Sequence, residues 1–139
     1  MIDPANGRAA AAGGGPEGVR SAPSYTLEDS RADADTHVLV LEGEIDIAAG
    51  DAIRAAFDRG LGDAGVLRIV VDLTEVTFID STMLKEMLRA AAALQVRDGA
   101  VVVAGIDGQP RRLLDLTGTA PLFTFAATRA DALRHAAPG

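Results

Sequence analysis

The sequence predicts a single α/β domain with a mostly parallel, mixed central sheet of four to five strands and about four helices. Two observations carry this prediction. Short apolar runs, typical of buried strands, alternate with longer stretches in which apolar residues recur at helical spacing. Such alternation is typical of parallel strands joined by right-handed crossover helices. The length of 139 residues suits one domain of this kind.

The first half of the domain contains two strand patterns and one helix pattern. A short strand is expected at Tyr25–Glu28, and a buried strand at His37–Glu42, which Gly43 is expected to end. A helix over 48–59 follows, with Asp46 near its start as the candidate N-cap. Its apolar face carries Ala49, Ala52, Ile53, Ala56 and Phe57.

The middle of the chain holds its most apolar strand. This strand is expected at Arg68–Leu73, followed by a short polar turn and a helix from about Ser81 to Arg97. Apolar positions recur in that helix at Leu84, Met87, Leu88 and Ala91, while Lys85, Glu86 and Arg89 fall on the other side. Asp98-Gly99 is a typical helix stop.

The last third repeats the alternation. It predicts a strand at Ala100–Ala104, a helix from near Gln109-Pro110 to Gly118, a short strand at Phe123–Ala126, and a helix Arg129–Ala136 capped by Thr128.

Residues 1–23 are expected to form a disordered N-terminal tail, with the folded domain over residues 24–139. The tail shows neither helix nor strand period and contains the run Gly13-Gly14-Gly15-Pro16. It lacks the pattern of a secretory signal, and no segment approaches the apolar length that crosses a bilayer. The protein is therefore expected to be soluble and cytoplasmic, without direct membrane contact.

Charge and cysteine content narrow the functional classes. Twenty acidic against thirteen basic residues give a net charge of −7, which disfavours nucleic acid and anionic membranes and suits a basic protein partner. The absence of cysteine excludes a disulfide framework, a thiol nucleophile and a thiolate metal site, and fits a reducing cytosol.

The segment Asp80-Ser81-Thr82 lies where the central strand gives way to a helix. Unpaired amides and a positive dipole at such a place suit a negative group, bound or attached. The alternative is plain N-capping by one of these side chains. A full capping box is absent, because Leu84 and Lys85 occupy the positions where Glu or Gln would complete it. Lys85 also opposes the helix dipole, which hints that anionic charge arrives here from elsewhere.

Other chemistries find little support. A serine nucleophile needs a base, and His37 and His135, the two histidines, lie at a strand start and near the C-terminus. Asp46, Asp72 and Asp80 offer carboxylates for a divalent metal, but a Gly-x-x-x-x-Gly-Lys phosphate loop is missing. A receiver domain phosphorylated on aspartate would need an acidic pair after its first strand, and Glu42-Gly43-Glu44 is a poor match for that pair. It would also need a lysine after a later strand, but Lys85, the sole lysine of the chain, lies in another element. No metal, cofactor or enzymatic activity is predicted.

Several short motifs together carry a family resemblance. They are Gly43-Glu44-Ile45-Asp46, Val71-Asp72-Leu73, Thr77-Phe78-Ile79-Asp80-Ser81-Thr82, Leu116-Thr117-Gly118 and Ala130-Asp131-Ala132-Leu133. In this order and spacing, over about residues 24 to 136, the chain resembles STAS domains, in particular the bacterial anti-sigma factor antagonists (anti-anti-sigma factors).

The resemblance implies a binding module that works by partner switching. Unphosphorylated, such a domain binds an anti-sigma factor of the histidine-kinase-like ATPase type and frees a sigma factor for transcription. The anti-sigma factor phosphorylates the motif serine, which aligns with Ser81, and the complex dissociates; a serine phosphatase resets the switch. Thr82 is the alternative acceptor. The resemblance also implies that the loop at Asp46 and the helix start at Ser81 flank one exposed surface.

The resemblance implies a partner-binding surface made of Asp46, Asp80, Ser81, Thr82, Met83 and Lys85. The chain departs from the family pattern at Met83 and Lys85, where many members have small residues. Met83 either presents an apolar side chain to a partner or packs inward, and Lys85 either faces solvent or pairs with a phosphate on Ser81.

Two rival functions remain open from sequence. STAS-like domains also serve as soluble subunits of transport or stress-signalling complexes, or as ligand-binding modules. An enzyme acting through Ser81 is the second rival.

Overall fold

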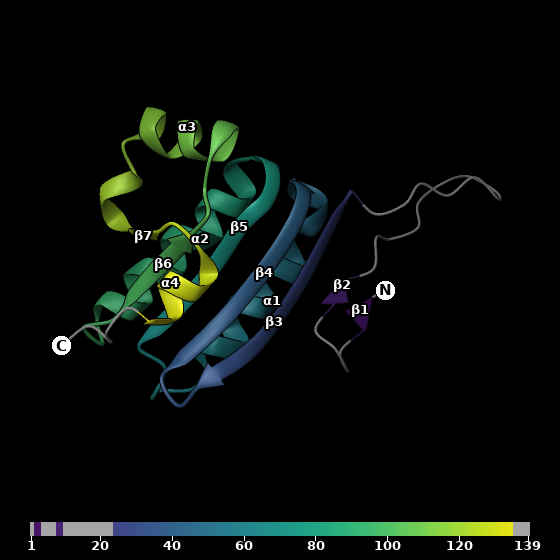
Figure 1. Cartoon of the computed structure of the whole chain (residues 1–139). Helices are drawn as coiled ribbons and strands as arrows, with labels where there is room; N and C mark the ends of the chain where they lie inside the picture. The colour runs from purple at the N-terminus through teal and green to yellow at the C-terminus, as the bar shows by residue number, and fades with distance from the viewer. Residues whose placement is uncertain (1, 4–7, 10–23, 135–139) are drawn as a thin grey trace.

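The computed structural model describes residues 2–3, 8–9 and 24–134, and Figure 1 shows their arrangement. The central sheet has five strands in the order β3-β4-β5-β6-β7. Its strands are β3 (Tyr25–Asp33), β4 (Thr36–Ile45), β5 (Arg68–Ile79), β6 (Ala100–Ala104) and β7 (Thr124–Ala126). Only the β3–β4 pair is antiparallel, so the predicted α/β domain with a mixed, mostly parallel sheet is confirmed.

Four α-helices and two single-turn 3-10 helices connect the strands. They are η1 (Ile47–Ala49), α1 (Gly50–Leu61), α2 (Ser81–Gln95), α3 (Gly108–Thr117), η2 (Ala120–Leu122) and α4 (Arg129–Arg134). Thr128 caps α4 by accepting a hydrogen bond from the amide of Asp131 at 3.0 Å, as predicted. Gly118 ends α3 in the left-handed conformation, because glycine has no Cβ to oppose a positive φ.

One face of the sheet packs against α1 and α2, and this layer contains the main core (Figure 1). The apolar face predicted for the first helix is buried as expected, including Ile53 and Phe57, and it meets sheet residues such as Leu39 and Val71. Burial of large apolar side chains of this kind contributes about 1.5–3 kcal/mol each. The helix layer therefore fixes where α1 and α2 begin.

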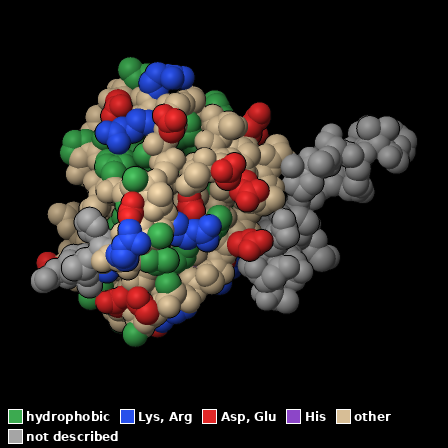
Figure 2. Space-filling model, viewed as in Figure 1, with side chains coloured by type: hydrophobic (Ala, Val, Ile, Leu, Met, Phe, Trp, Pro, Cys, Tyr) green, Lys and Arg blue, Asp and Glu red, His purple; other side chains and the backbone are tan. Residues whose placement is uncertain are grey.

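The opposite face of the sheet is only partly covered. The short helix α4 packs there against β5, β6 and β7, over a small cluster that includes Val70, Val102 and Ala132. On the part of this face formed by β3 and β4, Val38 is buried in that cluster, whereas Ser30 and Glu42 are exposed. Figure 2 shows acidic side chains gathered on this face, where Glu42 and Glu75 are exposed and occupy paired positions on β4 and β5.

Three strands are longer than the sequence predicts, and the first is β3, which was expected to end at Glu28 and continues to Asp33. Gly43 does not end β4, because its φ of +92° lets the strand continue through a register shift, where a Cβ would lie 2.2 Å from the carbonyl oxygen of Ser24. The polar turn expected after Leu73 is absent, and β5 continues to Ile79. The carboxyl half of β4 supplies the hydrogen-bonding partner that holds these polar residues in a strand.

A separate two-stranded antiparallel ladder pairs β1 (Ile2–Asp3) with β2 (Arg8–Ala9), and β2 lies against β3 (Figure 1). The sequence predicts no strand in this region. The rest of the predicted disordered tail, and the end of the last helix at Ala136, lie outside the described residues, so those expectations stay predictions. No helix in the described ranges has the length and apolar character needed to span a bilayer.

Candidate functional site

The candidate site forms where β4 and β5 end side by side. Ile45 and Ile79, the last residues of these parallel strands, occupy paired positions, and the amide of Asp80 donates to the carbonyl of Ile45 at 3.2 Å. Asp46 and Asp80 are therefore the first residues beyond adjacent strands. The carboxyl ends of parallel strands share one edge of a sheet, so the loops that follow them share one surface.

Asp46 and Asp80 both act as N-caps. Oδ1 of Asp46 accepts from the amide of Ala48 at 3.0 Å, and Oδ1 of Asp80 accepts from the amide of Thr82 at 2.8 Å. Each bond satisfies an amide that the helix itself leaves unpaired. Asp46 is an N-cap as predicted, but it caps the 3-10 helix η1, and the predicted helix starts later, at Gly50, without a side-chain cap. Within the Asp80-Ser81-Thr82 segment the capping role belongs to Asp80.

Ser81 is left at the first position of α2 with an exposed side chain. Within residues 24–134, its hydroxyl makes no hydrogen bond. Thr82 is only half exposed, and its Cγ2 faces Gly50 on α1, where an added Cβ would lie 3.0 Å away. Of the two candidate acceptors, Ser81 is the more accessible.

A groove of about 480 Å³ lies between the first turns of α1 and α2. Its lining residues are Ile47, Gly50, Asp51, Arg54, Ser81, Thr82, Lys85 and Glu86. The groove thus joins residues near Asp46 to the start of α2. Sequence reasoning missed the side of the groove formed by η1 and α1, in particular Ile47, which is 80% exposed, and Arg54. A large apolar residue directly after a capping aspartate was the available signal for Ile47.

The two departures from the family pattern differ in their placement. Met83 is fully buried in the core beneath α2, so of the two alternatives it packs inward and offers no side-chain surface to a partner. Lys85 is exposed, lines the groove, and forms no ion pair with any residue from 24 to 134.

Glu86 was expected beside Lys85 on the outer side of the helix, and this expectation is wrong. Glu86 is buried and accepts from Nε of Arg89 at 2.8 Å, while Nη1 of Arg89 meets Asp58 of α1 at 2.9 Å. Burial alone would lower the pKa of Arg89, but its bonds to Glu86 and Asp58 outweigh burial and raise that pKa. The reason is tertiary: α1 covers part of the outer face of α2.

The carboxylates considered for a metal do not gather. Asp72 pairs with Nε of Arg129 at 2.9 Å and accepts from the Thr74 hydroxyl at 2.6 Å, whereas Asp46 and Asp80 serve as caps at another place. Within the part of the chain that the structure describes, no three His, Asp or Glu side chains are grouped as metal ligands would be.

His37 is placed far along the sheet from Ser81. It lies near the start of β4, opposite Ile69, whereas Ser81 follows the far end of β5. Its Nε2 is bonded to Asp29 at 2.8 Å, and Arg59 holds the same carboxylate through Nε and Nη2. His135, the second histidine, lies outside the described residues. Within the described ranges no histidine is positioned to activate Ser81.

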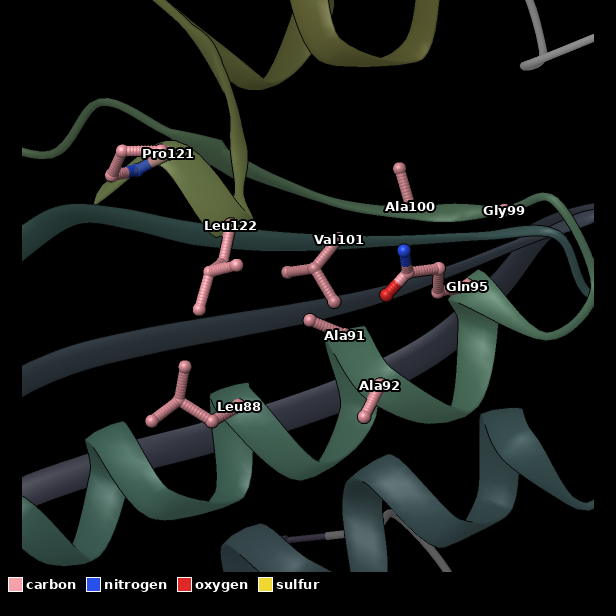
Figure 3. Close-up of a pocket in the computed structure, with 9 residues that line it drawn as sticks. All are labelled: Leu88, Ala91, Ala92, Gln95, Gly99, Ala100, Val101, Pro121 and Leu122. Carbon is pink, nitrogen blue, oxygen red and sulfur yellow. The ribbon is translucent and has the colours of Figure 1, made fainter. Parts of the chain in front are cut away.

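A second hollow, of about 320 Å³, lies between the C-terminal half of α2 and the segment after α3 (Figure 3). Leu88 of α2, Val101 of β6 and Leu122 of η2 point toward one another across it, and Gln95 lies at one end. The hollow contains no charged side chain and none of the site residues predicted from the sequence.

Comparison with known proteins identifies the family. Residues 29–132 match the model of the STAS domain. An anti-sigma-B factor antagonist of Listeria monocytogenes is 28% identical over 100 residues, which cover 72% of this chain and 87% of that protein.

Solved structures agree with this family assignment. The crystal structure of an anti-sigma factor antagonist from Mycobacterium paratuberculosis has a TM-score of 0.70 and 31% identity, covering 81% of this chain and 95% of that one. The phosphorylated form of the Bacillus cell fate determinant SpoIIAA has a TM-score of 0.64 at 22% identity, covering 77% and 96%, and so shares the fold. The chain belongs to the STAS domain family and, within it, to the anti-sigma factor antagonists, which are regulators and not enzymes.

Proposed function

We propose that this protein binds an anti-sigma factor of the histidine-kinase-like ATPase type through the surface around the α1–α2 groove. Binding sequesters the anti-sigma factor and frees its sigma factor in the cytoplasm. Phosphorylation of Ser81 by the bound partner ends the interaction, and a serine phosphatase restores it. The observation that carries this proposal is the exposed Ser81 hydroxyl, which has no hydrogen-bond partner within residues 24–134 and follows directly after the capping Asp80.

The chemical step requires little of this chain beyond presentation of the hydroxyl. Oγ of Ser81 attacks the γ-phosphorus of ATP held by the partner, the bond to the β-phosphate oxygen breaks, and ADP leaves. The hydroxyl proton passes to a base on the partner. A hydroxyl bound within its own fold would have to break that bond first, whereas Ser81 is free to enter a kinase site.

The proposed contact surface combines polar and apolar groups. Thr82 and Lys85 line the groove with Ser81, and the exposed Ile47 adds apolar area. Asp80 directly precedes Ser81, and Asp46 directly precedes Ile47. An exposed isoleucine amid polar residues gains most when a partner removes it from water. Met83 does not contribute to this surface, because its side chain is buried.

Phosphorylation acts on this surface by charge. A phosphate brings about −1.5 to −2 charges and lies beside the carboxylate of Asp80. Within the domain the positive end of α2 tolerates that charge, so the fold is retained. At an interface the same group is a desolvated anion, and a loss of about 2.8 kcal/mol lowers affinity about a hundredfold. SpoIIAA, a protein of the same fold, is known in a phosphorylated form.

The direct test is phosphate mapping after incubation with ATP and the partner anti-sigma factor. The wild-type protein, Ser81→Ala and Thr82→Ala are compared by fragmentation of the tryptic peptide 69–85, which contains both hydroxyls. Phosphate is expected on Ser81 in the wild type and in Thr82→Ala, and absent from Ser81→Ala. Phosphate that persists in Ser81→Ala contradicts the assignment.

A binding measurement tests the consequence. Ser81→Asp is expected to weaken partner binding about a hundredfold while the circular dichroism spectrum stays that of the wild type. Ser30→Asp is the matched control, because Ser30 is an exposed serine on β3, near the opposite end of the sheet. Equal binding by the two variants overturns the proposed switch.

A further inference from the structure

Two cations that line the groove beside Ser81 have no ion-pair partner among residues 24–134. Arg54 comes from α1 and Lys85 from α2, and neither forms an ion pair with a residue in the range 24–134. Most other arginines in that range are engaged. Ion pairs with carboxylates hold Arg31, Arg59, Arg89, Arg111, Arg129 and Arg134, and backbone carbonyls hold Arg68 and Arg97. The net charge of the chain is −7, and within residues 24–134 unpaired cations are the exception.

The positions of the two cations relate them to Ser81. Lys85 is four residues after Ser81, so it lies one turn along on the same side of α2. Arg54 is four residues after Gly50, which lies close to the side chain of Thr82. The two cations therefore stand on opposite walls of the groove, each one turn beyond its start.

A backbone amide at a helix start can bind an anion, but the amide of Thr82 already makes a hydrogen bond within the domain. It donates to the carboxylate of Asp80 at 2.8 Å, so a phosphate on Ser81 would have to displace that cap to reach it. The two cations remain available. The groove also holds two carboxylates, Asp51 and Glu86, but Glu86 is neutralised by its bond to Arg89.

We propose that Arg54 and Lys85 form an internal clamp that holds the phosphoryl group of phosphorylated Ser81 in the α1–α2 groove. This inference rests on the proposed phosphorylation of Ser81. The guanidinium of Arg54 offers forked donors that match two phosphate oxygens, and the ammonium of Lys85 adds a mobile point charge. The clamp ties α1 to α2 through the modification itself.

The clamp changes the charges that this surface presents to the anti-sigma factor. In the unphosphorylated protein the two exposed cations line the groove without an ion-pair partner among residues 24–134, and they suit acidic groups on the anti-sigma factor. After phosphorylation the same cations are engaged internally, so the surface gains negative charge and loses two positive contacts in one event. Switching off is then stronger than the added phosphate alone would make it.

The test uses full-length protein with phosphoserine installed at position 81 by genetic code expansion, so that no kinase is needed. Titration followed by ³¹P NMR reports the second pKa of the phosphate, which is about 6 when unperturbed. A phosphate held by two cations is expected to titrate about one pH unit lower than in a peptide of the same residues. Arg54→Gln and Lys85→Gln should each move that pKa back toward the peptide value.

Arg112→Gln is the matched control. Arg112 is an exposed arginine on α3 that does not line the groove and has no ion pair within residues 24–134, so its loss removes one charge and no clamp contact. If the phosphate pKa is the same in Arg54→Gln and in Arg112→Gln, the proposed clamp is wrong. A thermal scan gives a second readout, because phosphorylation should raise the melting temperature of the wild type more than that of Arg54→Gln.

Failure of the clamp and failure of the proposed function are distinguishable. If the partner never phosphorylates Ser81, the proposed function is wrong, while the installed phosphoserine still decides whether the groove binds phosphate. If the partner phosphorylates Ser81 and the three variants titrate alike, the switch stands and the clamp is wrong.

Discussion

The first turns of α1 and α2 meet at Gly50 and Thr82, where a Cβ placed on Gly50 would lie 3.0 Å from Cγ2 of Thr82. The start of α1 therefore lies close to the helix that carries Ser81. Glycine in the middle of a helix is unfavourable by about 0.5–1 kcal/mol relative to alanine, and this is the upper limit for Gly50, which is the first residue of α1. Its presence here is explained by the close approach of the two helices.

A double-mutant cycle tests this contact. Gly50→Ala alone is expected to be close to neutral, because the gain in helix propensity is offset by crowding against Thr82. In the background of Thr82→Ser, which lacks Cγ2, the same change should raise the free energy of unfolding, by at most about 0.5–1 kcal/mol because Gly50 is the first residue of α1. Urea unfolding of the four proteins measures the coupling. Equal effects of Gly50→Ala in both backgrounds contradict a contact that limits this position.

A second prediction follows from the different roles of Asp80, which caps α2, and Ser81, which does not. Asp80→Ala removes the bond to the Thr82 amide and should cost about 1 kcal/mol of stability. Ser81→Ala removes a hydroxyl without a bond in the described structure and should stay within about 0.5 kcal/mol of the wild type. Asp80→Asn retains a capping side chain and serves as control. A larger loss in Ser81→Ala than in Asp80→Ala, measured by chemical unfolding, would reverse these assignments.

A third prediction concerns pH and the buried carboxylate of Asp29, whose side chain is 3% exposed. Burial alone would raise the pKa of Asp29, but hydrogen bonds from His37 and Arg59 outweigh it and hold that pKa below its ordinary value. A carboxyl with a lowered folded pKa stabilises the protein above its unfolded pKa, about 3.9. That contribution disappears as the pH falls further, through the folded pKa.

Asp29→Asn should therefore be less stable than the wild type near neutral pH, by about 2 kcal/mol, because charged hydrogen bonds are lost. The difference should shrink as the pH falls below about 4. Urea unfolding at a series of pH values measures it, with Glu44→Gln as an exposed-carboxyl control. A difference that stays constant through the acidic range excludes Asp29 as a source of acid sensitivity.

A fourth prediction concerns Gln109, whose side-chain amide makes the two backbone hydrogen bonds that a neighbouring strand would otherwise make. Oε1 accepts from the amide of Ile79 at 2.9 Å, and Nε2 donates to the carbonyl of the same residue at 2.9 Å. The pairing of β5 with β6 ends at Asp72, so this amide satisfies the far end of β5 just before Asp80. Gln109→Ala should cost about 1–3 kcal/mol, because two backbone groups lose their partners.

Hydrogen exchange at the Ile79 amide measures the effect directly and should speed up in Gln109→Ala. Gln109→Glu keeps an acceptor for the amide but no donor for the carbonyl, so protection of the amide should be partly retained. Gln95→Ala is the matched control on an exposed glutamine. Unchanged exchange in Gln109→Ala would mean that the strand end is held by other contacts.

The parts of the fold that could be predicted have local signatures. Strands buried on both faces are continuous apolar runs, so β4 and β6 were located by sequence, and the apolar spacing of α1 predicted its buried face. Caps are local as well, because Asp46 and Thr128 bond amides within three residues of themselves. The order of these local patterns was enough to indicate the fold and the resemblance to the family.

The remaining features depend on neighbours far along the chain. The polar end of β5 is a strand only because β4 and Gln109 supply its hydrogen bonds, and Glu86 is buried only because α1 covers it. The sequence by itself determined that a hydroxyl, Ser81, follows a cap at a helix start. Only the tertiary structure decided that Arg54 and Ile47 share its groove, because strand register at Ile45 and Ile79, and not local spacing, brings the two helix starts together.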